Sequence, residues 1–239
     1  MKLGPFRRFH HVVVGVADPD AAARDWARVF GTPILDGRDG PRIPVGDAWI
    51  ELTSGERHGT GVVRVAVEVN DAAALAGAAR AAGVAVGRHE GHVLVELNGV
   101  RIELREDDGR AAPPADVVFT RFHHVVVAVA DDAAAVRRWG EVFAFTPAPE
   151  GPDGRVVSHH VPVGDAWFGL TSAGTDADAV ARFVARRGEG VYALALVAPD
   201  RGALAARVTA AGGRLIGQPS DFQTFVHPAT THGVLLELA

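Results

Sequence analysis

Cysteine is absent from this 239-residue chain, which excludes disulfides, thiolate metal ligands and a cysteine nucleophile. No apolar run is long enough to span a bilayer, and no Lys/Arg block offers a surface for nucleic acid or an anionic membrane. Residues 1–8 have neither the apolar core nor the small-residue cleavage site of a signal peptide. We therefore expect a cytoplasmic protein with no nucleic-acid or membrane partner.

The signatures of several enzyme classes are also missing. No Walker loop, dinucleotide-binding glycine fingerprint or Gly-x-Ser-x-Gly elbow follows a strand in the required context, which argues against nucleotide binding and nucleophilic serine chemistry. With 48% hydrophobic and 22% charged residues, the composition is that of a globular protein. The length leaves room for two domains that each bury a core.

The chain contains two copies of one pattern. Residues 9–18 recur almost unchanged as residues 122–131, and residues 44–49 recur as residues 162–167. Repetition at this long spacing indicates two copies of a whole domain. A charged and then Pro-rich stretch between the copies is typical of a linker. We therefore predict an N-terminal domain at residues 1–106, a linker at 107–118 and a C-terminal domain at 119–239.

Each half is predicted to hold two βαβββ modules, which makes the fold class α+β. In the first module, Asp18 can cap a helix, Pro19 can open it and Gly31 can end it. In the second module, Asn98 and Gly99 favour a tight two-residue hairpin. The strands expected in the first half are residues 9–17, 34–35, 42–45, 48–53, 61–69, 84–86, 92–97 and 100–105, with a second helix at 71–82.

The second half repeats this order with one addition. Its expected strands are residues 122–130, 156–162, 166–171, 191–197, 215, 222–227 and 234–238, and its helices lie around 136–143 and 201–211. A helical pattern at residues 176–187 has no counterpart in the first half. Trp26 and Trp139 lie at matching positions on helix faces, where we expect them in the core.

Four such modules, each half opening on Phe-His-His and closing on Ile-Glu-Leu or Leu-Glu-Leu, resemble the vicinal oxygen chelate superfamily. Residues 187–190 and 225–238 look most like its methylmalonyl-CoA epimerase and glyoxalase branch. The resemblance implies two tandem domains with cupped mixed sheets. It also implies a divalent metal that binds two substrate oxygens and stabilises an enolate-like intermediate. Imidazole and carboxylate ligands suit Mn, Fe, Co, Ni or Zn.

The family pattern takes metal ligands from the first and last strands of facing modules. The residues at the corresponding positions are His11, Glu51, Arg64 and Glu103 in the first half, and His124, Gly169, Ala193 and Glu237 in the second. Several of these depart from the pattern. Arginine stays protonated and has no lone pair to give, and Gly169 and Ala193 carry no donor atom.

Modules of this superfamily pair either within one domain or between domains. Pairing within the first domain would bring His11, Glu51 and Glu103 to face Arg64, whose guanidinium could neutralise both carboxylates in place of the metal. The second domain would then hold a small-residue cavity around His124 and Glu237.

Exchanged pairing would instead bring His11, Glu51 and Glu237 together across Ala193. The other site, with His124, Gly169, Arg64 and Glu103, would then be inactive. Both arrangements share His11 and Glu51 as the first metal ligands. Glu103 or Glu237 is the predicted third ligand. A plainer alternative is that His11 and Glu51 only hydrogen-bond each other or Arg64.

Other residues are predicted to act on the substrate. Glu237 is the candidate general base, because a desolvated carboxylate can remove a proton next to a carbonyl, with His124 or Glu103 as a further catalytic group. The alternative for Glu237 is a buried acid paired with His124. The substrate-binding candidates, each of which could instead be structural, are Trp49, Trp167, His160, His227 and Arg64.

Three functions follow from this pattern. The first is metal-dependent proton transfer on a carbonyl substrate, as in an epimerase, isomerase or glyoxalase-like lyase. The second is a metal-free binding protein like the drug-sequestering resistance proteins of the superfamily, and the third is a metal-free acid–base enzyme using His124 and Glu237. Extradiol dioxygenase activity is less expected, because neither half supplies the second histidine of a two-His, one-carboxylate iron site. The partner is expected to be a small molecule, and the protein a monomer or homodimer.

Overall fold

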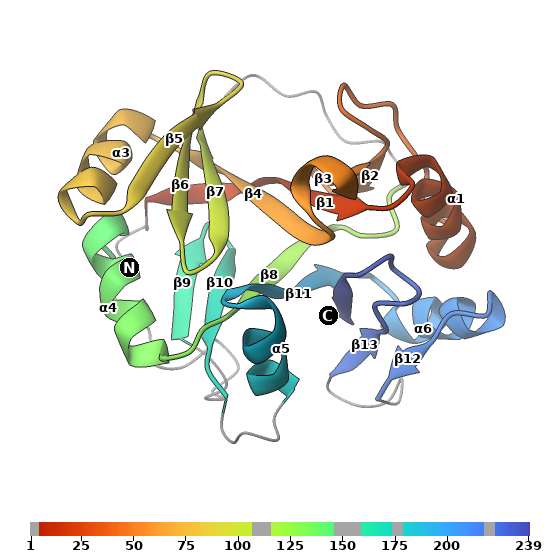
Figure 1. The fold of residues 1–239 in the computed structure, drawn as a ribbon. Coiled ribbons are helices and arrows are strands. Elements are labelled where there is room, and N and C mark those ends of the chain that lie inside the picture. The colour runs from red at the N-terminus through yellow and green to blue at the C-terminus, as the bar shows by residue number, and fades with distance from the viewer. Residues whose placement is uncertain (1–4, 107–115, 146–158, 174–178, 218–222) are drawn as a thin grey trace. The chain divides into compact units, whose positions relative to one another are not determined.

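The computed structural model describes residues 5–106, 116–145, 159–173, 179–217 and 223–239. The chain divides into two compact units. Unit 1 contains Met1–Phe9, Arg64–Gly109 and His124–Tyr192, and unit 2 contains His10–Val63, Arg110–His123 and Ala193–Ala239. Strands β1 (Phe6–Val16), β4 (Gly61–Val69), β8 (Arg121–Ala128) and β11 (Gly190–Val197) each contribute residues to both units. The elements are labelled in Figure 1.

Unit 1 has two runs of paired strands. In the first run, β4 pairs in parallel with β7 (Val100–Arg105), which continues antiparallel through β6 (His92–Leu97) to β5 (Ala85–His89). In the second run, β8 pairs in parallel with β10 (Ala166–Thr171), which pairs antiparallel with β9 (His159–Val163), and Phe6 of β1 pairs with Val163. The helices of unit 1 are α3 (Ala72–Ala81), α4 (Asp132–Phe143) and α5 (Ala179–Arg187).

Unit 2 repeats the same plan. In its first run, β1 pairs in parallel with β3 (Ala48–Ser54), which pairs antiparallel with β2 (Arg42–Val45). In its second run, β11 pairs in parallel with β14 (Leu235–Leu238), which continues antiparallel through β13 (Thr224–Val226) to β12 (Leu215–Ile216). The helices of unit 2 are α1 (Pro19–Phe30), the short α2 (Gly55–His58) and α6 (Arg201–Ala210). The α+β class with vicinal-oxygen-chelate-like modules is therefore confirmed.

Local sequence chemistry explains the ends of α1 and the last hairpin of unit 1. The Asp18 side chain accepts a hydrogen bond from the Ala21 backbone N–H at 2.9 Å, Pro19 stands at the first helical position, and Gly31 ends the helix with φ = 74°. Asn98 and Gly99 both have positive φ, as a type I′ turn requires. These sequence-based predictions are confirmed.

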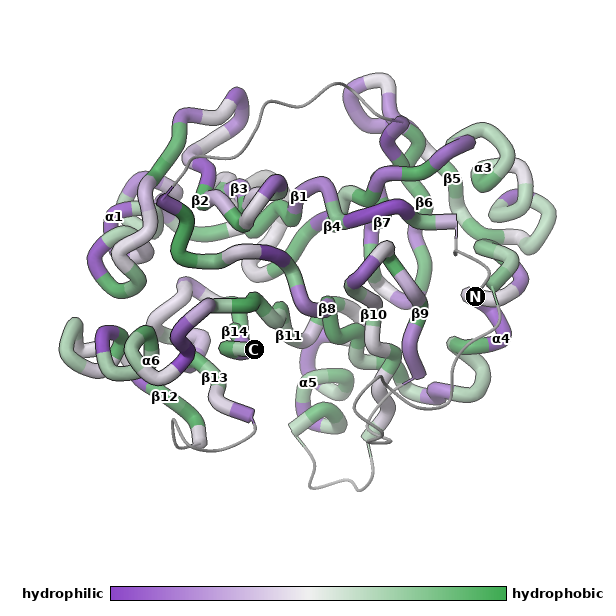
Figure 2. The backbone as a smooth tube through the Cα atoms, turned by 180° about the vertical axis from the view of Figure 1, so that it is seen from behind, coloured by the Kyte–Doolittle hydropathy of each residue, from purple (hydrophilic) through white to green (hydrophobic). Residues whose placement is uncertain are grey.

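The core lies between the helices and one face of each strand run. In unit 2, the buried leucines of β11 and β14 alternate along the strands and are register partners, so they share one face of the run. Figure 2 shows hydrophobic positions running through β11 and β14. Trp26 and Trp139 are fully buried, which confirms their predicted core positions.

Some predicted elements differ from the structure. The strand expected at residues 34–35 is only an isolated bridge between Leu35 and Arg42, because the segment has no continuous partner strand. Helix α2 was not predicted. Most of the predicted linker (107–118) lies outside the described residues, as do the starts of the elements expected at 156–162, 176–187 and 222–227.

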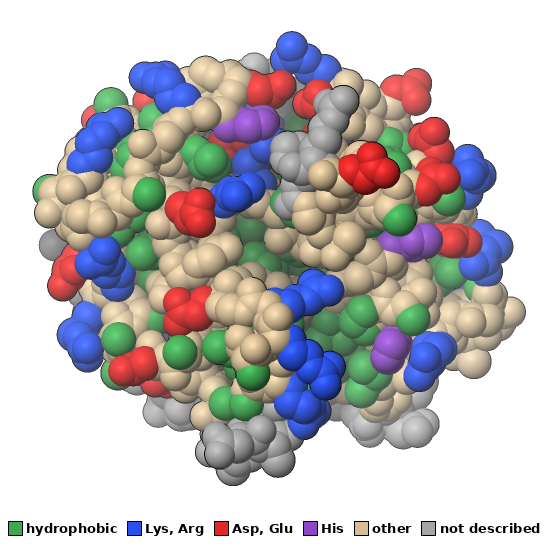
Figure 3. Space-filling model, viewed as in Figure 1, with side chains coloured by type: hydrophobic (Ala, Val, Ile, Leu, Met, Phe, Trp, Pro, Cys, Tyr) green, Lys and Arg blue, Asp and Glu red, His purple; other side chains and the backbone are tan. Residues whose placement is uncertain are grey.

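The described helices are all too short or too polar to span a membrane. Acidic and basic side chains are interspersed over the face shown in Figure 3. Within the described ranges, Ile216 is the exposed large hydrophobic residue.

Candidate functional site

A stack of three side chains lies across the first strand run of unit 2. The His11 ring stacks on Trp49 with ring centroids 5.2 Å apart and an interplanar angle of 2°. The guanidinium carbon of Arg42 lies 4.6 Å from the centre of the same indole. Because β3 is the middle strand of this run, Trp49 lies between the other two side chains. Both faces of Trp49 are thus covered by side chains, and its predicted contact with a substrate stays a prediction.

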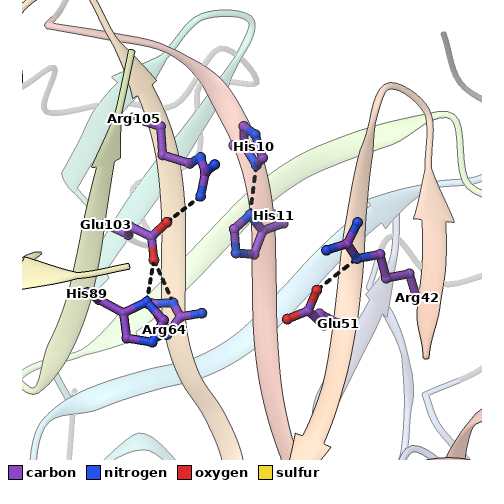
Figure 4. A network of polar contacts seen from close by, with 8 residues as sticks. All are labelled: His10, His11, Arg42, Glu51, Arg64, His89, Glu103 and Arg105. Carbon is purple, nitrogen blue, oxygen red and sulfur yellow. Dashed lines mark hydrogen bonds and ion pairs between the residues drawn. The ribbon is translucent and has the colours of Figure 1, made fainter. Parts of the chain in front are cut away.

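Glu51 is held by an arginine that the sequence analysis did not single out. Arg42 Nε lies 2.8 Å from Glu51 Oε2, and the two residues are direct partners in the antiparallel pairing of β2 and β3. Glu51 is almost completely buried, so its charge needs this partner. Figure 4 shows the Arg42 side chain directed at the carboxylate.

His10 and His11 form a buried imidazole pair. Their Nδ1 atoms are 2.7 Å apart, so one ring donates a proton to the other. The donor ring must therefore carry its proton on Nδ1, and the acceptor ring, when neutral, carries its proton on Nε2. This contact therefore links the tautomer of His11, the first predicted metal ligand, to that of His10.

Unit 1 holds Glu103 within a basic cluster. Glu103 is only 1% exposed, and its Oε1 accepts a hydrogen bond from Arg105 Nη1 at 2.7 Å. Arg64 Nε lies 2.9 Å from the other oxygen, Oε2, and His89 Nδ1 lies 3.4 Å from it. Figure 4 shows both oxygens of this carboxylate engaged. Arginine at the strand position where the family pattern expects histidine thus supplies positive charge directly to Glu103.

The pairing of Arg64 with Glu103 is close but not well aligned. Although the two atoms are 2.9 Å apart, neither Arg64 Nε nor Glu103 Oε2 has a hydrogen bond of acceptable angle within the described part of the chain. The contact is therefore an ion pair without a directed hydrogen bond. Charge, rather than hydrogen-bond geometry, keeps Arg64 against this carboxylate.

A second stack in unit 1 matches the one in unit 2. His124 stacks on Trp167 at 5.2 Å, and His160 stacks on the same indole at 4.9 Å. His160 occupies the position of Arg42 in the repeat, and its register partner is Gly169. Its neighbour His159 points the other way and lies 3.5 Å from Asp132 in α4. Of the two adjacent histidines, His160 therefore shares a face with His124 and Trp167, and its substrate-binding role stays a prediction.

Glu237 is a buried carboxylate on the second strand run of unit 2. It is the register partner of Ala195 on β11 and of Phe225 on β13. Alternation places Ala193 on the same face. Two alanines and one phenylalanine therefore share this face with Glu237.

Two further histidines of unit 2 have structural contacts. His227 Nδ1 accepts a hydrogen bond from the Ala229 backbone N–H at 3.0 Å, which favours its structural alternative. His232 Nε2 lies 3.0 Å from Asp25 Oδ2. The pKa of Asp25 is lowered chiefly by its hydrogen bond from the Arg28 guanidinium. Burial opposes this lowering, and the hydrogen bond with His232 adds a smaller lowering.

The charges next to two of the predicted metal ligands oppose the binding of a divalent metal. Glu51 and Glu103 already face guanidinium groups, and a dication 4 Å from a guanidinium would be repelled by roughly 8 kcal/mol at an effective dielectric constant of about 20. No group of three or more His, Asp or Glu side chains close enough to hold a metal occurs in the described ranges. Glu51 and Glu103, as they are paired here, therefore do not fit a transition metal.

Four residues next to the predicted ligands were not predicted from the sequence: Arg42 and His10 in unit 2, and His89 and Arg105 in unit 1. Counting outward from the turn at residues 46–47 would have placed Arg42 opposite Glu51. Arg105 stands two residues after Glu103 and so shares its face. The position of His89 has no such signal, because it depends on the pairing of β5 and β6 at the hairpin end.

One family model matches the second half of the chain. The family model described as "Glyoxalase/Bleomycin resistance protein/Dioxygenase superfamily" matches residues 121–238. A search of curated proteins found no matching sequence.

Solved structures share the fold at low identity. A mutant of 4-hydroxymandelate synthase from Streptomyces coelicolor matches with a TM-score of 0.75 and 16% identity, covering 98% of this chain and 92% of that one. A xylose isomerase-like TIM barrel/4-hydroxyphenylpyruvate dioxygenase fusion protein matches with a TM-score of 0.69 and 17% identity, covering 99% of this chain. This chain spans only 49% of the fusion protein. The sequence of residues 121–238, which the structure divides between both units, therefore matches the glyoxalase, bleomycin resistance protein and dioxygenase superfamily.

Proposed function

We propose that this protein binds a small molecule through its own side chains, without a divalent metal at His11, Glu51 or Glu103. Membership of residues 121–238 in the superfamily supports a small-molecule enzyme or binding protein. The observation that carries the metal-free choice is the pairing of each N-terminal carboxylate with arginine: Glu51 with Arg42, and Glu103 with Arg64 and Arg105.

Metal-dependent proton transfer is the competing function. It needs Glu51 or Glu103 to exchange its arginine for the metal, which would leave a partly buried guanidinium without its carboxylate. The methylmalonyl-CoA epimerase and glyoxalase branch, which the sequence resembles, corresponds to this competing function. The metal content of the purified protein distinguishes metal-dependent proton transfer from metal-free binding.

A metal-free acid–base enzyme is the second candidate. Burial of Glu237 favours it, because a positioned carboxylate can accept a proton next to a carbonyl.

Ligand retention tests the main proposal. Native mass spectrometry of untagged, natively purified protein would show any small molecule that co-purifies, and thermal shift with carbonyl, aromatic and antibiotic-like compounds would identify replacements. A ligand present at 100 times its Kd should stabilise the protein by about 2.7 kcal/mol. We expect this stabilisation to be the same with and without EDTA. Stabilisation that disappears in EDTA would contradict the proposal.

Proton exchange tests the second candidate. Carbonyl compounds that stabilise the protein would be incubated with it in D2O, and loss of the α-proton signal would be followed by NMR. Exchange that is present in the wild type and lost in Glu237→Gln would support an enzyme. Binding without proton exchange would support a binding protein and not an acid–base enzyme.

A further inference from the structure

Arg64 is held in place at two of its three guanidinium nitrogens. Its Nε lies 2.9 Å from Glu103 Oε2, and its Nη1 lies 2.9 Å from His89 Nε2. A guanidinium can only donate, so His89 Nε2 must be the acceptor and the neutral ring carries its proton on Nδ1. That nitrogen faces Glu103 Oε2 at 3.4 Å. Figure 4 shows Arg64 and His89 both directed at the carboxylate.

The third nitrogen of Arg64 is open. Nη2 has no hydrogen bond to the described part of the chain and is not among the buried atoms, and the side chain is 13% exposed. This nitrogen therefore carries N–H donors that reach solvent from a largely buried guanidinium.

Two guanidinium groups face the one carboxylate of Glu103. Arg64 contacts its Oε2 and Arg105 donates to its Oε1. The open donor belongs to Arg64. A guanidinium that is already immobilised loses little side-chain entropy when it binds an anion, and charge-assisted hydrogen bonds to an oxyanion are strong.

We propose that Arg64 binds an oxyanion, a carboxylate or a phosphate, through Nη2. Glu103 and His89 act as positioning residues that fix the guanidinium. This inference rests on the proposed function, because the oxyanion is a group of the small molecule that the protein binds. It assigns that molecule to the anionic class.

Titration with simple anions tests this inference. Sodium acetate and sodium phosphate would be added at constant ionic strength, with sodium chloride as the reference, while the 15N-labelled arginine side chains are followed by NMR. We expect saturable shifts of the Arg64 Nε–H signal with acetate or phosphate, and the anion that saturates it identifies the oxyanion. Absence of saturable shifts with both anions would overturn the proposal.

Variants locate the site. Arg64→Gln should weaken anion binding at least tenfold, and Arg64→Lys, which keeps the charge without the planar fork, should weaken it less. Arg101→Gln is the matched control: Arg101 lies on the neighbouring strand β7, is half exposed and pairs with Glu96 at 3.5 Å, so its loss should leave binding unchanged. Undiminished binding in Arg64→Gln, or an equal loss in Arg101→Gln, would contradict the assignment.

Two further readouts keep the test decisive. If Arg64→Gln does not fold, Arg64→Lys decides, and unchanged affinity in that variant would overturn the role of the guanidinium fork. His89→Asn should weaken binding and move the Arg64 Nε–H signal in the free protein, which a residue without a positioning role would not do. Failure of these anion tests would leave metal-free ligand retention intact, whereas a bound metal would overturn the proposed function itself.

Discussion

The two equivalent tryptophans allow one buried hydrogen bond to be weighed against one missing hydrogen bond. Trp139 Nε1 donates to Asn98 Oδ1 at 2.9 Å in unit 1, whereas Trp26 Nε1 in unit 2 is buried and has no partner in the described part of the chain. Replacement by phenylalanine removes the same volume from two fully buried sites, so the packing loss is similar.

The polar contribution then differs in sign. Trp139→Phe loses a hydrogen bond worth about 1 kcal/mol, whereas Trp26→Phe removes an unpaired buried donor whose desolvation costs about 1–3 kcal/mol. Trp139→Phe should therefore be more destabilising than Trp26→Phe by at least about 2 kcal/mol, or roughly 4–8 °C in Tm for a chain of this size.

The assay must report on each unit, because two compact units can unfold separately. Amide hydrogen exchange provides the free energy of opening in unit 1 for Trp139→Phe and in unit 2 for Trp26→Phe, with Tm as a second readout. Asn98→Ala, alone and combined with Trp139→Phe, isolates the hydrogen bond by a double-mutant cycle. Equal losses for the two phenylalanine variants, or a larger loss for Trp26→Phe, would refute the reasoning.

Two further predictions concern charge. Glu103→Gln should destabilise unit 1 by about 3–5 kcal/mol, because it leaves two largely buried guanidinium groups without their carboxylate. Glu96 is exposed, so Glu96→Gln should change stability by less than about 1 kcal/mol. Similar losses for both variants in urea unfolding would contradict the buried pairing. The hydrogen bond from Arg28 holds the pKa of Asp25 in the folded protein below its value in the unfolded chain. Ionised Asp25 therefore stabilises the protein at pH values above the unfolded pKa. This stabilisation is lost as the pH falls through the folded pKa. Carboxyl NMR titration checks this direction, and a folded pKa at or above the ordinary aspartate value would contradict it.

Local patterns in the sequence predicted most elements of the fold. The ends of α1 follow from the hydrogen-bonding capacity of Asp18, the fixed φ of Pro19 and the conformational freedom of Gly31, which are properties of single residues. The turn at Asn98 and Gly99 is local in the same way. The strand expected at residues 34–35 failed because its apolar pair has no continuous partner strand.

The site was harder to predict because it depends on register and on side-chain reach. The sequence identified Glu51 and Glu103 as important, but their arginine partners depend on which residues face each other across β2–β3 and β4–β7. Arg64 was expected to be able to neutralise both carboxylates. In the structure Arg64 pairs with Glu103, and Glu51 forms its ion pair with Arg42 instead. The domain boundary and the assigned roles of His124 and Glu237 stay predictions.

The central claim is that arginine, rather than a metal, neutralises the N-terminal carboxylates. Elemental mass spectrometry of untagged, natively purified protein tests it most directly, repeated after incubation with Mn, Fe, Co, Ni or Zn and removal of free metal. The account predicts far less than one equivalent of any transition metal, with no change in His11→Ala or Glu51→Ala. About one equivalent of metal in the wild type, lost in both variants, would contradict it and would restore metal-dependent proton transfer as the function.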